Sequence, residues 1–89
     1  MANLYLIDKP AGAQALELAK ADPNAQVVLI QDGVYLDARP LNTAKRKVYA
    51  VKRDAELRGL AGRLPSFVQQ IDYSALVDLI FANKVVNFA

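Results

Sequence analysis

Residues 27–36, VVLIQDGVYL, constrain the fold of this chain more than any other stretch. Four apolar residues in a row, without alternating polar residues, predict a strand that is buried on both faces. Such a strand is typical of the middle of a parallel sheet covered by helices. The run ends abruptly at Gln31, Asp32 and Gly33, and ligands or partners usually meet a parallel sheet at the carboxyl ends of its strands. The polar trio therefore marks a candidate functional edge.

The rest of the sequence alternates between strand-like and helix-like segments joined by short links. We expect strands at 3–8, 26–31, 47–51, 67–71 and 84–88, and helices at 13–21, 32–37, just after Asp54, and at 73–82. This alternation predicts a single α/β domain over residues 1–89. We expect a small three-layer α/β/α sandwich, with a mainly parallel sheet of about five strands and helices on both faces.

Local signals predict where the helices begin and end. Asp32, Asp54 and Asp72 stand where N-caps are expected, and Gly59 suits a left-handed C-cap. The Arg-Pro pair at 39–40 should end the helix at 32–37, and 41–46 should form a polar loop. The expected apolar stripes are Ala15, Leu16, Leu18 and Ala19 in the first helix, and Tyr73, Leu76, Val77, Ile80 and Phe81 in the last.

Apolar residues make up 54% of this short chain, which is more than a lone domain of its size easily covers. We therefore expect part of the apolar surface to face another subunit. The longest apolar runs are only a few residues, so we expect no membrane span and no signal peptide. A cytoplasmic location is expected, and the absence of cysteine fits a reducing compartment.

The net charge is only +2, but most basic residues lie in the middle of the chain. They are Arg39, Lys45, Arg46, Lys47, Lys52, Arg53, Arg58 and Arg63. Such a region can meet RNA, an anionic ligand or an acidic partner, although we favour the simpler interpretation, a solvated loop and helix face. No aromatic residues interleave with these charges as base stacking requires, so direct nucleic-acid binding is not expected.

The chain contains neither cysteine nor histidine. This excludes a thiolate nucleophile, a persulfide carrier, a thiolate metal site and a Ser-His-Asp triad. The four glycines form neither a P-loop nor a dinucleotide fingerprint. We therefore predict no catalytic residue, no metal and no cofactor, and a lysine or aspartate enzyme with Lys9 as amine nucleophile is a minor alternative.

Polar residues follow the first four predicted strands, and in a parallel sheet these positions gather on one edge. We call this set, together with Tyr35, the carboxyl rim; it comprises Asp8, Lys9, Gln31, Asp32, Tyr35, Lys52, Arg53, Asp54, Asp72 and Tyr73. The rim is a candidate pocket or docking surface, and Tyr35 is the best interface candidate. Helix capping explains the aspartates without any further function.

Three blocks of the sequence resemble a known family. They are VLIQDGV at 28–34, KVYAVKRDAELRGL at 47–60 and IDYSALVDL at 71–79, preceded by LYLIDKP at 4–10. Their order and spacing resemble the DsrH/TusB family of the DsrE/DsrF/DsrH-like superfamily. Members typically show a LLIQDGV strand and turn, a VYAL-x-x-D-x-x-ARGL strand and helix, and an IDY-x-x-FV-x-L helix start.

The resemblance implies a small α/β/α fold and a role in sulfur relay, in which persulfide sulfur passes between proteins. TusB-type members assemble with TusC- and TusD-like subunits for 2-thiolation of the tRNA wobble uridine. DsrH-type members occur with DsrE- and DsrF-like subunits in sulfur oxidation. The main sulfur-carrying cysteine belongs to the DsrE/TusD-like subunit. Some DsrH proteins carry another cysteine, and that position falls near Ala19 here; Phe88 stands where an aromatic, often tryptophan, is expected.

The resemblance and the missing thiol together predict a non-catalytic, cysteine-free subunit of a sulfur-relay complex. Its expected partners are DsrE/TusD-like and DsrF/TusC-like subunits, with Lys52 and Arg53 favouring a partner's thiolate or persulfide. The alternative is a stand-alone, homo-oligomeric DsrH-like binding protein of another role, with copies of itself as partners.

Overall fold

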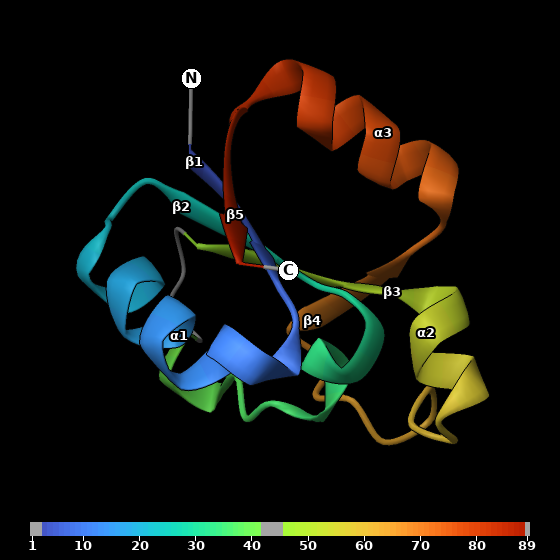
Figure 1. Cartoon of the computed structure of the whole chain (residues 1–89). Coiled ribbons are helices and arrows are strands. Elements are labelled where there is room, and N and C mark those ends of the chain that lie inside the picture. The colour runs from blue at the N-terminus through green and yellow to red at the C-terminus, as the bar shows by residue number, and fades with distance from the viewer. Residues whose placement is uncertain (1–2, 42–45, 89) are drawn as a thin grey trace.

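The computed structural model describes residues 3–41 and 46–88 (Figure 1). Within these residues, five parallel strands form one sheet in the order β4-β3-β2-β1-β5. The strands are β1 (Asn3–Ile7), β2 (Ala25–Leu29), β3 (Lys47–Val51), β4 (Val68–Ile71) and β5 (Lys84–Phe88). The α-helices are α1 (Gly12–Ala21), α2 (Lys52–Leu57) and α3 (Tyr73–Ala82). Short 3₁₀ turns are η1 (Lys9–Ala11), η2 (Gln31–Tyr35) and η3 (Arg39–Leu41). The predicted α/β fold is confirmed.

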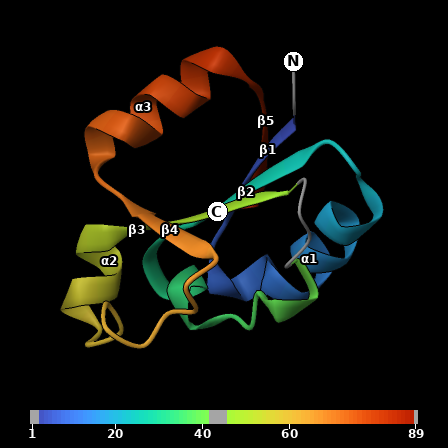
Figure 2. The ribbon, with the colours of Figure 1, turned by 180° about the vertical axis from the view of Figure 1, so that it is seen from behind.

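Helices cover both faces of the sheet, as the alternation of segments predicted. The chain steps from β1 to β4 in one direction, with α1, η2 and the α2 segment packed on one face. It then crosses the other face through α3 and returns to add β5 beside β1. Figures 1 and 2 show α1 and α3 on opposite sides of the strands.

The strand predicted to be buried on both faces is β2, and the structure confirms that burial. Val27 packs in the core beneath α1, whereas Val28 packs in the core beneath α3, and both side chains are fully buried. In the sheet, Val28 lies opposite Leu6 of β1 and Tyr49 of β3. Burial of each such side chain stabilises the fold by about 1.5–3 kcal/mol. Because neighbouring residues of β2 belong to different cores, this strand links the two cores.

Phe88 lies in β5, a strand at the edge of the sheet, and provides the aromatic anchor that was expected there. Its ring stacks on that of Tyr5, with centroids 6.1 Å apart. This contact ties β5 to β1 on the α1 face of the sheet.

Two predicted N-caps are wrong. Strands β2 and β3 run almost directly into helical turns, so the turns begin earlier than the sequence suggested. Because η2 begins at Gln31, Asp32 lies inside its first turn. Because α2 begins at Lys52, Asp54 also lies inside a first turn rather than at a cap. Both carboxylates are therefore available for other contacts.

Other helix signals were read correctly. The Asp72 carboxylate caps α3 by accepting a hydrogen bond from the Ala75 N–H at 2.8 Å. Gly59 follows α2 with φ +68°, a conformation that favours glycine.

The helix expected at 32–37 is instead the 3₁₀ turn η2, and Pro40 lies within a second turn. Leu41 is buried rather than part of a polar loop, and residues 42–45 of that predicted loop lie outside the described residues.

The predicted apolar stripes are only partly correct. Leu18 of α1 is 46% exposed. On α3, the side that packs on the sheet carries Ala75, Leu76, Leu79 and Ile80. Tyr73, Val77 and Phe81 lie on the adjacent flank and are exposed, Phe81 to 85%. The apolar arc of α3 is therefore wider than the part that the sheet covers.

No helix within the described residues is long and apolar enough to cross a membrane.

Leu4 provides a test of the core beneath α3, because its side chain is fully buried there. Leu4→Ala should lower the free energy of unfolding by about 2–5 kcal/mol through lost burial and the cavity left behind. The matched control is Leu57→Ala, since Leu57 is 67% exposed and the change should stay within about 0.5 kcal/mol. Urea unfolding measures both, and equal losses would contradict this description of the core.

Candidate functional site

Asp54 lies at the centre of the carboxyl rim. It is the one buried charged residue in the described part of the chain, with 7% exposure. Its Oδ2 accepts a hydrogen bond from the Gln31 N–H at 2.8 Å, and its Oδ1 accepts a long one from the Tyr73 hydroxyl at 3.5 Å. One carboxylate thus connects the segments that follow β2, β3 and β4.

The turn that Asp54 holds has an unusual backbone. Gln31 has φ +49°, which lies in the left-handed region that non-glycine residues seldom occupy. Two residues later, Gly33 lies against the Ile7 carbonyl oxygen, where a Cβ would collide with the backbone. The hydrogen bond to Asp54 and this close approach together fix how the chain leaves β2.

Arg58 contacts two aspartates of the carboxyl rim, Asp32 and Asp54. Its Nε donates to Asp32 Oδ1 at 2.8 Å, and its Nη1 donates to the Asp54 carbonyl at 3.1 Å. The same Nη1 lies 3.9 Å from Asp54 Oδ1. The hydrogen bond that Arg58 donates to the Asp32 carboxylate raises the pKa of the Arg58 guanidinium. Both carboxylates are therefore engaged in contacts within the protein.

A second group forms at the end of β1. The Asp8 carboxylate caps η1 by accepting from the Lys9 N–H at 2.6 Å. The Lys9 ammonium lies 5.6 Å from the centre of the Tyr35 ring, which is a cation–π contact. Tyr35 is 51% exposed. This corner presents a cation and an aromatic ring together.

Lys52 and Arg53 project from the start of α2 and are exposed. In residues 3–41 and 46–88, neither side chain makes a hydrogen bond or ion pair. Asp72 and Tyr73 begin α3 at the neighbouring strand end, and Tyr73 is 54% exposed. The structure therefore brings Gln31, Asp32 and Tyr73 together around Asp54, keeps the Asp8–Lys9–Tyr35 group separate, and leaves the side chains of two cations unpaired. No group of three metal-ligating side chains occurs within the part of the chain described.

The rim lies where the topology favours a crevice. The connection after β3 leads to the α1 face, through α2, whereas the connection after β4 leads to the opposite face, through α3. Neighbouring strands whose connections diverge in this way form a switch point, where open α/β sheets commonly bind ligands or partners.

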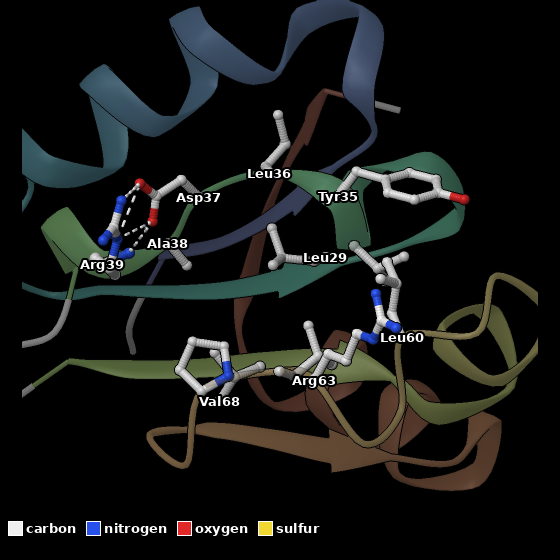
Figure 3. Close-up of a pocket in the computed structure, with 12 residues that line it drawn as sticks. Leu29, Tyr35, Leu36, Asp37, Ala38, Arg39, Leu60, Arg63 and Val68 are labelled. Carbon is white, nitrogen blue, oxygen red and sulfur yellow. Dashed lines mark hydrogen bonds and ion pairs between the residues drawn. The ribbon is translucent and has the colours of Figure 1, made fainter.

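Sequence reasoning missed a pocket on the α1 face of the sheet. It has a volume of about 360 Å³ and lies between η2, η3 and the loop after α2 (Figure 3). Its apolar wall includes Leu29, Val34, Leu36, Leu60, Leu64 and Val68. Arg39 and Arg63 also line it. Each lies close in sequence to leucines and a proline, but this proximity alone does not predict a pocket.

One end of this pocket holds an ion pair. Arg39 donates from Nε to Asp37 Oδ1 at 2.9 Å and from Nη2 to Asp37 Oδ2 at 2.7 Å. The bidentate contact lowers the pKa of Asp37 to about 2. Figure 3 shows this pair at one side of the pocket and Tyr35 at the other.

Replacing Asp54 tests its place at the centre of the rim. Asp54→Ala leaves the Gln31 N–H without its acceptor and removes the carboxylate contacts with the Tyr73 hydroxyl and Arg58, so the free energy of unfolding should fall by about 1–3 kcal/mol. Asp54→Asn keeps a carbonyl acceptor and should cost less. Asp78→Ala, at an exposed position of α3, is the control. Denaturant unfolding provides the measurement, and an Asp54→Ala variant as stable as the control would disprove the assignment.

Comparisons with known proteins agree with this fold. The family described as "DsrH like protein" matches residues 11–86. The crystal structure of the ychN protein from E. coli is similar over 99% of both chains, with a TM-score of 0.81 and 18% identity. The solution NMR structure of protein Tm0979 from Thermotoga maritima has a TM-score of 0.65 and 32% identity, covering 90% of this chain and 92% of that one. No curated protein matches the chain.

Proposed function

The chain belongs to the DsrH-like family, and we propose that it is a non-catalytic subunit of a cytoplasmic sulfur-relay complex. The family is an accessory type of sulfur-relay subunit. In its TusB and DsrH branches, the relay serves 2-thiolation of the tRNA wobble uridine or sulfur oxidation. The proposed partners are DsrE/TusD-like and DsrF/TusC-like subunits, which follow from the family resemblance.

The observation that carries this proposal is the absence of cysteine in a member of a sulfur-relay family. Covalent sulfur transfer needs a thiolate to receive the sulfur, and this chain has none. The four carboxylates of the rim all accept hydrogen bonds within the protein: Asp54 and Asp32 from Gln31 and Arg58, and Asp8 and Asp72 as caps of η1 and α3. What the chain offers to a relay is therefore a surface that binds and shapes its cysteine-bearing neighbour.

We assign the contact with that neighbour to the exposed flank of α3. Tyr73, Val77 and Phe81 recur at four-residue intervals and so form one apolar stripe. Exposed apolar groups of this kind mark protein interfaces, and aromatic residues are enriched at their centres. The stripe starts at Tyr73, whose hydroxyl also reaches Asp54. A subunit seated on the stripe would therefore extend over the carboxyl rim.

Lys52 and Arg53 supply the electrostatic part of the proposal. They are exposed, and no carboxylate in the described residues pairs with them. A cation close to a thiol favours the thiolate and lowers the pKa of that thiol. We therefore assign to these residues the stabilisation of a partner's thiolate or persulfide at the rim.

The docking assignment is tested by co-expression with the organism's DsrE- and DsrF-like proteins and native mass measurement. We expect a hetero-oligomer containing this chain, and Phe81→Asp should abolish its incorporation because a charge would enter an apolar contact. Leu18→Asp is the control, since Leu18 is similarly apolar and exposed but lies on α1. Undiminished assembly of the Phe81→Asp protein, or a homo-oligomer that takes up neither partner, would overturn the proposal.

The electrostatic assignment is tested in the assembled complex. Replacing Lys52 and Arg53 together by glutamate should raise the pKa of the partner's thiol, so sulfur transfer near neutral pH should fall about two- to fivefold. The rate should recover at high pH, where the thiol ionises without help. Lys20→Glu, an exposed change on α1, should leave the profile unchanged. An unaltered pH–rate profile in the double variant, with the complex intact, would refute the assignment.

A further inference from the structure

The pocket on the α1 face combines features that neither the family nor the proposed function explains. It is concave, and its volume of about 360 Å³ falls within the range of about 300–1,000 Å³ that is usual for small-molecule sites. Its walls come from β2, the η2–η3 segment, and the segment between α2 and β4. Apolar side chains contribute most of the lining, so the body of a ligand would be largely desolvated.

The charges around the pocket favour a negatively charged group. Asp37 is the one acidic residue that lines it, and Arg39 already binds both of its carboxylate oxygens. The guanidinium of Arg63, which lines the pocket from the loop after α2, makes no hydrogen bond or ion pair within residues 3–41 and 46–88. Lys9 adds a second cation beside Tyr35, another lining residue. An anion in the pocket would thus meet the unpaired guanidinium of Arg63, with the Lys9 ammonium nearby, and no free carboxylate.

We propose that this pocket binds a small organic anion, made of an apolar body and one carboxylate, sulfonate or phosphate group. Leu36, Leu60 and Leu64 would contact the body, and the Arg63 guanidinium would bind the charged group. The site is independent of the sulfur-relay proposal. It shares Tyr35 with the rim, so an occupied pocket would lie directly beside the Lys9–Tyr35 contact.

The binding experiment uses octanoate as the probe, with octanol and octylamine as neutral and cationic matches, followed by amide NMR of the whole chain. Octanoate should produce saturable shifts at Leu36, Leu60 and Arg63, and octanol should bind at least about fivefold more weakly. Octylamine should not bind. Affinity should rise by up to about fourfold for each methylene from butanoate to octanoate, because each buried methylene adds about 0.8 kcal/mol.

A matched pair of variants tests the role of Arg63. Arg63→Gln should weaken octanoate about five- to tenfold and leave octanol unchanged, and because the residue is exposed the fold should be retained. Lys84→Gln, which removes an exposed cation at the start of β5, should have no effect on either. The proposal is overturned if octanol and octanoate bind equally, if chain length does not matter, or if the shifts fall on α3. It is also overturned if a partner subunit, and not octanoate, perturbs the pocket.

Discussion

The burial of β2 on both faces is the constraint on which the rest of the structure depends. Val27 and Val28 point into different cores, so the strand is stable only with a helical layer on each side. Parallel pairing with β1 and β3 then brings three strand ends to one edge. The carboxyl rim is thus a consequence of how a central apolar strand must be covered.

At that edge the chain uses its polar residues to hold itself together. Asp54 joins three strand ends, and Arg58 engages Asp32. These internal contacts leave the exposed cations of α2 and the apolar flank of α3 as the features that face outward. These outward-facing features, together with the lack of cysteine, support the proposed role in contact with a partner.

Much of the fold was predictable because strong local signals agreed with the tertiary structure. The apolar run at 27–30 indicated a central strand, and Asp72 and Gly59 marked the ends of helices correctly. Asp54 was placed wrongly because a cap and a first-turn carboxylate look alike in sequence. The exposure of Phe81 depends on how α3 is rotated over the sheet, and the pocket depends on loops that meet only in the folded chain. Neither is encoded in a local pattern.

Hydrogen–deuterium exchange on the assembled complex tests the central claim, action through contact, most directly. If this chain works by seating a cysteine-bearing subunit on α3, the amides of Tyr73–Ala82 should become protected in the complex relative to the isolated chain. The α1 amides, which lie on the far side of the sheet, should change little. Protection confined to α1, or none anywhere in the chain, would contradict the account.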